Sequence, residues 1–184
     1  MALADELEMM IGHATGYAGG AGVVSAVIPT EPAGGRRVFL CAVDGADGYR
    51  SWIALDGEGA PLRDRRELRD AVGIAALCEV AVDAAAGGDV DELISRLSEL
   101  REREAPEGIE DAEAAALELR DVVGVPPQVA SPKRLDAIGA AARRLERELD
   151  STSGSPFTAA MKAAQDSVAE LQREVEAGYL LPLS

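Results

Sequence analysis

The sequence of 184 residues predicts an α+β protein: an N-terminal helix, a three-stranded antiparallel β-meander, then five helices ending in an antiparallel helical hairpin. Apolar runs separated by glycine-rich turns between residues 22 and 56 indicate the strands. After residue 61 the apolar residues recur with the period of a helix. The hairpin rests on two apolar stripes with helical spacing, on either side of the short segment 151–155: Leu135, Ile138, Ala142, Leu145 and Leu149, then Phe157, Met161, Ala164, Val168, Leu171 and Val175.

The first helix is expected over residues 3–12. Leu3, Leu7 and Met10 fall on one side of it, and the acidic residues fall on the other, near the N-terminus where they are favourable. A segment with five glycines, residues 12–22, then follows. We expect these glycines to end the helix and to form a loop.

Three strands are expected over residues 23–28, 37–43 and 49–55. The middle one is apolar on both faces, which predicts a central strand. Residues 44–48 contain two Asp-Gly steps and suit a tight hairpin connection between the second and third strands. The sheet therefore has two apolar faces that need cover.

The helical part begins with a long helix over residues 62–86, charged in its first half and apolar in its second. A helix that is apolar nearly all round is a buried one, so the second half is expected to pack on the sheet. Further helices are predicted over 89–104 and 109–123, and a stiff proline-containing linker over 124–130. Ser-Pro pairs at 131–132 and 155–156 have the pattern of a helix N-cap followed by proline.

This order suggests an α+β domain over 1–123, the linker 124–130, and a helical hairpin with a C-terminal tail over 131–184 that packs on the first part. The long helix would cover one face of the sheet. The other face would be covered by the N-terminal helix, the hairpin or a second copy of the chain. This last possibility is the reason to expect a homodimer.

Charge and composition disfavour several classes of partner. The net charge is −15, and no cluster of Arg and Lys is free of nearby Asp and Glu, so nucleic acids and anionic membranes would be repelled. A basic protein partner, a cationic ligand or solubility alone fits better. The acidic N-terminus without an apolar run after it, and only two cysteines, Cys41 and Cys78, indicate a cytoplasmic protein with reduced, buried thiols.

The first candidate for a ligand site is the glycine-rich segment 12–22. Such a segment can expose backbone N–H groups to a ligand, and His13, Thr15, Tyr17, Gly19 and Gly20 would form the site. It lacks the Lys-Ser/Thr ending of a phosphate-binding loop and precedes a strand, so a flexible connection is the alternative. With one histidine and no Cys-x-x-Cys motif, a zinc site of the usual kind is not available, so no metal is expected. Aromatic residues make up only 3% of the chain and leave few rings on which a flat cofactor could stack, so no cofactor is expected either.

Catalytic side chains are scarce while amphipathic helix surface is plentiful. The favoured hypothesis is therefore a non-catalytic, acidic interaction or adaptor protein; a small-ligand-binding protein or enzyme that uses the segment around His13 is the alternative. Trp52 is a candidate partly exposed anchor or core residue, and Tyr179, Leu180 and Leu181 form an apolar tail that docks on the core or on a neighbour. The opening α-β-β-β-α order resembles that of small acidic secretion chaperones in architecture, without a shared motif.

Overall fold

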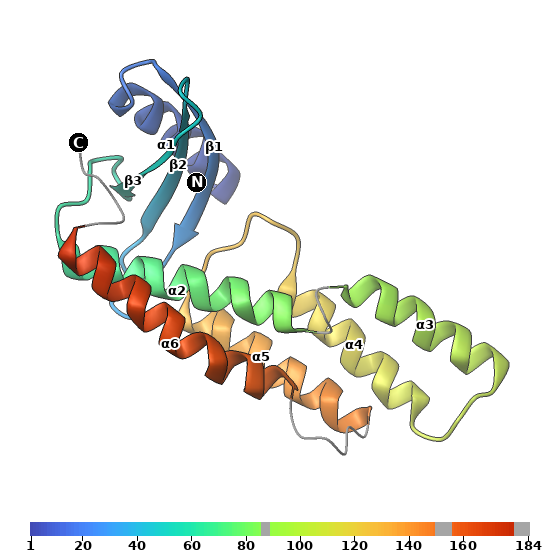
Figure 1. Ribbon diagram of the computed structural model, residues 1–184. Helices are drawn as coiled ribbons and strands as arrows, with labels where there is room; N and C mark the ends of the chain where they lie inside the picture. Colours follow the sequence, from blue (N-terminus) through green and yellow to red (C-terminus); the bar gives the residue numbers. More distant parts are fainter. Residues whose placement is uncertain (86–88, 150–155, 179–184) are drawn as a thin grey trace. The chain divides into compact units, whose positions relative to one another are not determined.

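The computed structural model describes residues 1–85, 89–149 and 156–178 (Figure 1). One helix, three strands and five further helices follow one another, which confirms the predicted fold class. The elements are α1 (Leu3–Tyr17), β1 (Gly22–Thr30), β2 (Val38–Gly45), β3 (Arg50–Asp56), α2 (Arg65–Ala84), α3 (Val90–Arg103), α4 (Ile109–Val123), α5 (Pro132–Glu148) and α6 (Pro156–Ala177). None of the described helices is both long enough and apolar enough to cross a membrane.

The sheet is antiparallel throughout, in the order β1-β2-β3. Every residue of β2 from Val38 to Val43 is buried, which confirms the prediction that this strand is central. Cys41 lies between Val27 of β1 and Ile53 of β3. Because side chains alternate along a strand, β2 presents an apolar set to each face.

Helices of the same chain contact both faces of the sheet. On one face, Phe39 and Cys41 pack with Met10 and Ala14 of α1. On the other, Leu40 and its neighbours pack with α2 and with the end of α6 (residues: Val38, Leu40, Ala54, Leu62, Leu68, Ala71 and Val175). The N-terminal helix is thus the cover that the second face required. A bare face no longer argues for a homodimer, which stays a prediction.

The N-terminal helix is longer than expected. It continues to Tyr17, so Gly12, His13 and Thr15 are helical and the expected loop over 12–22 is wrong for its first half. A glycine inside a helix costs about 1 kcal/mol relative to alanine. Burial of Ala14 against the sheet, in the extra turn, favours the longer helix. The connection to β1 begins only after Tyr17, where Gly19 and Gly20 adopt positive φ angles of 66° and 74°.

The second half of the long helix was expected to pack on the sheet, and this is correct only for residues near the middle of α2. Leu68 and Ala71 pack on the sheet, with Val72 and Ala75 partly buried beside them. Ala81 and Ala85, farther along, are buried in a cluster made by other helices. The charged first half reaches the sheet because a helix needs only one apolar stripe, and the apolar second half has helices as its neighbours.

The residues form two compact units that do not follow chain order. Unit 1 contains Met1–Ala76, Pro127–Pro132 and Ser167–Ser184, and unit 2 contains Leu77–Pro126 and Lys133–Asp166. The expected division into 1–123, 124–130 and 131–184 follows chain order and stays a prediction. The elements α2 and α6 supply residues to both units.

The segment expected to be a linker is held to the sheet at its end. Ala130 is buried, and its N–H donates to the carbonyl oxygen of Pro29 at 2.9 Å. Its own carbonyl oxygen accepts from the N–H of Glu31 at 2.8 Å. These bonds form a short parallel bridge between Thr30 and Ala130. Residues 127–132 are therefore part of unit 1 and not only a spacer.

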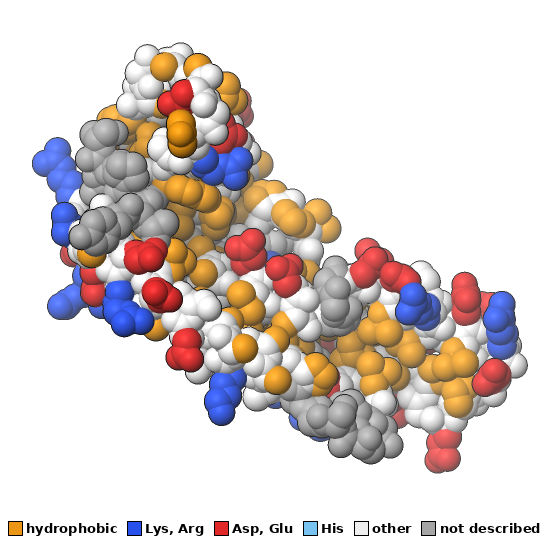
Figure 2. Space-filling model, in the orientation of Figure 1, with side chains coloured by type: hydrophobic (Ala, Val, Ile, Leu, Met, Phe, Trp, Pro, Cys, Tyr) orange, Lys and Arg blue, Asp and Glu red, His pale blue; other side chains and the backbone are white. Residues whose placement is uncertain are grey.

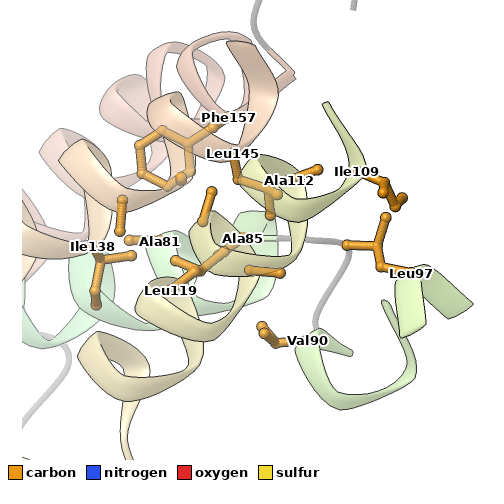
Figure 3. Close-up of a cluster of buried hydrophobic side chains, with 14 residues drawn as sticks. Ala81, Ala85, Val90, Leu97, Ile109, Ala112, Leu119, Ile138, Leu145 and Phe157 are labelled. Carbon is orange, nitrogen blue, oxygen red and sulfur yellow. The ribbon is translucent and has the colours of Figure 1, made fainter. Parts of the chain in front are cut away.

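Unit 2 is built around one helical core (Figure 3). The stripe of α5 was expected to pack mainly on α6, but Ile138 and Leu145 share their cluster with Leu119 of α4 and Ala81 of α2 as well as with Phe157 of α6. Glu118 of α4 and Arg144 of α5 form an ion pair. The stripe of α5 is therefore buried from several sides in a core of several helices. A prediction that pairs α5 with α6 alone does not include these other contacts. The connection 151–155 and the tail residues Tyr179, Leu180 and Leu181 lie outside the described residues.

Candidate functional site

The residues expected to bind a ligand around His13 do not converge on one point. The His13 imidazole lies against Gly59, where an added Cβ would come within 2.4 Å of the ring. The Thr15 hydroxyl donates to the carbonyl oxygen of Ile11, one turn back in its own helix, at 2.7 Å. Gly19 and Gly20 face open space. Of the five expected residues, Tyr17 alone lines a groove described for unit 1, and its side chain is 52% exposed.

This groove, called here the α1-end groove, has a volume of about 400 Å³. It is bounded by the C-terminal end of α1, the turn into β1, the β2–β3 hairpin and the first half of β3. Tyr17 contributes an aromatic ring, Ser51 a hydroxyl and Asp47 a carboxylate. The lining residues are Tyr17, Ala18, Ala21, Gly22, Val43, Gly45, Ala46, Asp47, Ser51, Trp52 and Ile53.

Two local features position these side chains. A Cβ on Gly22 would lie 2.5 Å from Cγ1 of Val43, so only glycine lets the chain approach β2 this closely as it leaves α1. On the opposite side, Oδ1 of Asp47 accepts from the N–H of Tyr49 at 3.1 Å and orders the β2–β3 turn. The groove is therefore shaped by backbone constraints at both ends.

The electrostatics of the α1-end groove favour a cation. No Lys or Arg is among its lining residues, and the last turn of α1 carries no basic side chain to offset the negative end of the helix dipole. Nearby, Arg50 is paired with Asp44 at 2.7 Å. Its guanidinium, by hydrogen bonding, lowers the pKa of the Asp44 carboxyl group. Elsewhere acidic side chains are scattered between basic and apolar ones over the face seen in Figure 2.

Beside the groove, the outer edge of β3 is open in its first half. In its second half, the N–H of Leu62 donates to the carbonyl oxygen of Ala54, and the N–H of Asp56 donates to that of Ala60, both at 2.8 Å. Since backbone groups alternate in direction along a strand, those of Arg50 and Trp52 also point to this edge. Within the described part of the chain no strand pairs there, because β3 is last in the sheet.

The edge of β1 is protected by contrast. Pro29 has no N–H to offer, the register shifts between Val24 and Ala26, and Ala130 occupies the end of the strand. Proline, bulges and short covering segments are the usual ways in which proteins block a sheet edge. The first half of β3 lacks these features and is flanked by Tyr49, which is 77% exposed. Trp52 is half-buried against the core beneath α2. It therefore belongs to the core and also lies at the open edge of the sheet.

Sequence reasoning flagged Tyr17 and Trp52, for different reasons, and missed Asp47 and Ser51. The Asp-Gly steps were assigned to turn chemistry, and Asp47 does stabilise the turn. The strand register pairs Ser51 with Val43 and so brings hairpin residues under the end of α1. The groove forms where the end of α1 lies beside the polar β2–β3 hairpin. The sequence could have located it only if the end of α1 had been predicted correctly.

Both cysteines are buried, as expected. Burial raises the pKa of the Cys41 thiol to about 12. A thiol kept protonated and away from solvent is a poor nucleophile. Among the described residues, no group of three or more His, Cys, Asp or Glu side chains is arranged to hold a metal ion.

Thiol labelling tests this burial. At pH 8 a disulfide reagent is expected to label neither Cys41 nor Cys78 in the native protein, and to label both after unfolding in urea. Because burial raises the pKa of the Cys41 thiol from its ordinary 9.0 to about 12, the unfolded state loses this proton first, and the free energy of unfolding falls as the pH rises across this interval. Rapid labelling of a Cys78→Ser variant, which leaves Cys41 alone, in the native state would contradict the prediction.

No protein-family model, curated protein sequence or solved structure matches this chain.

Proposed function

We propose that this protein is a non-catalytic interaction protein that binds an extended, basic segment of a partner polypeptide along the open edge of β3. The observation that carries the proposal is the open half-edge at Arg50 and Trp52, directly beside the cation-favouring α1-end groove. Addition of a strand to a sheet edge is a common mode of peptide recognition. Main-chain hydrogen bonds supply affinity, and pockets for alternate side chains supply specificity.

The geometry gives each side of such a peptide a distinct environment. Alternate side chains of an added strand would point to the α1 face, near Tyr17 and Asp47, or to the α2 face, near Trp52. A Lys or Arg on the first side would enter a groove that lacks positive charge. The net charge of −15 would also accelerate the encounter with a basic partner, and this effect weakens with salt.

Trp52 is the single tryptophan of the chain and reports binding at this edge by its fluorescence. The probe is a capped peptide of alternating Val and Lys, and the matched control peptide alternates Val and Glu. We expect a saturable change in Trp52 fluorescence with the Val-Lys peptide and none with the Val-Glu peptide. Binding of the Val-Lys peptide should be weaker at high salt. Asp47→Asn is expected to raise the Kd about fivefold, as loss of one partly exposed ion pair (~1 kcal/mol) would.

A charge-matched variant distinguishes the effect of a charge in the groove from the effect of the protein's overall negative charge. Glu99 is an exposed residue of α3 in unit 2, and Glu99→Gln removes the same charge. If Glu99→Gln weakens binding as much as Asp47→Asn, or if the Val-Glu peptide binds as well as the Val-Lys peptide, the proposal is wrong. Far-UV circular dichroism of both variants shows whether they are folded.

Small-ligand binding is the second candidate, because Tyr17, Ala18, Ala21 and Gly22 of the glycine-rich segment all line the groove. Spermidine tests it in the same assay. Saturation by spermidine, lost in Asp47→Asn, together with no response to the Val-Lys peptide, would favour a small cationic ligand and reject the peptide. Self-association in sedimentation velocity, lost when the Val-Lys peptide is added, would identify a second copy as the occupant of the edge.

A further inference from the structure

Unit 2 contains a second groove of about 400 Å³, between α5 and α6. Both helices contribute one face to it, with side chains spaced three and four apart. At one end, the backbone N–H of Phe157 donates to Oε1 of Glu146 at 2.7 Å and ties the start of α6 to α5. The lining residues are Leu135, Asp136, Gly139 and Arg143 of α5, and Phe157, Thr158, Met161, Lys162 and Gln165 of α6.

Gly139 shapes the groove. It is buried in the middle of α5, where glycine costs about 1 kcal/mol relative to alanine. A Cβ there would lie 3.5 Å from Cε1 of Phe157 and 3.2 Å from Nη1 of Arg143. The missing side chain thus leaves space in which the Arg143 guanidinium lies over the helix, close to the Phe157 ring. The Phe157 side chain, 3% exposed, forms an apolar floor.

The charge of this groove is opposite to that of the protein. Arg143 and Lys162 face it from different helices, and Asp136 is its single acidic residue, so the lining carries a net charge of +1 in a chain of −15. Within the described residues neither cation forms an ion pair, whereas Arg144 of α5 is paired with Glu118 and Arg101 of α3 with Glu113. Arg143 and Lys162 are therefore available to a ligand.

We propose that the α5–α6 groove binds a small organic monoanion with an apolar body, such as a medium-chain or aromatic carboxylate. The carboxylate would be held by Arg143 and Lys162, since a guanidinium and an ammonium group are the usual partners of an organic anion. The apolar body would lie along Leu135, Met161 and the Phe157 floor. Thr158 and Gln165 add polar groups at the rim. This site is independent of the α1-end groove, which favours a cation.

The test uses three ligands of one chain length: octanoate, octanol and octylamine. Isothermal titration is expected to detect saturable binding of octanoate, weaker binding of octanol and the weakest binding of octylamine. Octanoate should also raise Tm, because a ligand that binds only the folded state stabilises it. Arg143→Gln and Lys162→Gln are each expected to raise the Kd for octanoate at least fivefold.

The matched control is Arg147→Gln, which removes the same charge from an exposed position on the same helix outside the groove. It is expected to leave the Kd for octanoate within twofold of the unmodified protein. Equal binding of octanoate and octanol, equal effects of all three substitutions, or no binding of octanoate at millimolar concentration would each overturn the proposal. Unchanged circular dichroism and Tm of the unliganded variants show that a lost affinity is not a loss of folding.

Discussion

The Phe39→Ala substitution is expected to lower the free energy of unfolding of unit 1 by about 3–5 kcal/mol, the usual cost of replacing a buried phenylalanine. Phe39 is 1% exposed, lies in the central strand and packs beneath α1 with Met10 and Ala14. Its loss would leave a cavity that three separate elements border, and the stiff sheet cannot close it. Because small domains are stable by only about 5–15 kcal/mol, such a loss would unfold part of the population at modest urea concentration.

Urea unfolding followed by Trp52 fluorescence checks this prediction, since Trp52 belongs to unit 1 and circular dichroism reports mainly on the helices. Tyr49→Ala is the matched control, because it also removes an aromatic ring but from a side chain that is 77% exposed. We expect it to change stability by less than about 0.5 kcal/mol. Similar losses for both variants would show that Phe39 is not in the core of this sheet.

The second large effect is expected for Leu119→Ala in unit 2, with a loss of about 2–5 kcal/mol. Leu119 is fully buried on α4, in a cluster that includes Ala81 of α2, Ile138 of α5 and Phe157 of α6 (Figure 3). The alanines around it leave little flexible side chain to fill the cavity. The measurement is urea unfolding followed by circular dichroism at a helical wavelength.

Leu100→Ala on α3 is the control for Leu119→Ala. It removes the same atoms from a side chain that is 38% exposed, so its cost should stay below about 1.5 kcal/mol. If the two leucine variants lose the same stability, or if Leu119→Ala loses less than 1 kcal/mol, the assignment of Leu119 to the centre of the helical core is wrong.

Local sequence patterns predicted the kind and order of elements well, and failed where distant contacts matter. The central position of β2 followed from apolar residues on both its faces, and the starts of α5 and α6 followed from Ser-Pro pairs. The end of α1 was placed too early, since glycines in the sequence suggested a loop. Ala14 packs against the sheet, and that contact stabilises a helical turn that the helix propensity of the glycines around it disfavours.

The candidate site was predictable only in pieces. Tyr17 and Trp52 stood out as single residues, but two strands, β1 and β2, and three connections separate them in the chain. The pairing of Val43 with Ser51, and the approach of Gly22 to Val43, bring them to the same groove. Asp47 gave no separate signal because aspartate before glycine is common in turns. The groove of unit 2 likewise brings Gly139 of α5 together with Phe157 of α6, which the sequence pattern of neither helix indicates.

The sequence alone determined that this chain is an acidic α+β protein with a β-meander followed by helices, because apolar periodicity and turn chemistry depend on residues close together in the chain. Only the tertiary structure decided that α1 covers the second face of the sheet, that Ala130 joins the end of β1, and that the residues divide into two units across the chain order. These features depend on which distant surfaces bury one another. Burial is a property of pairs of elements, and no single segment encodes it.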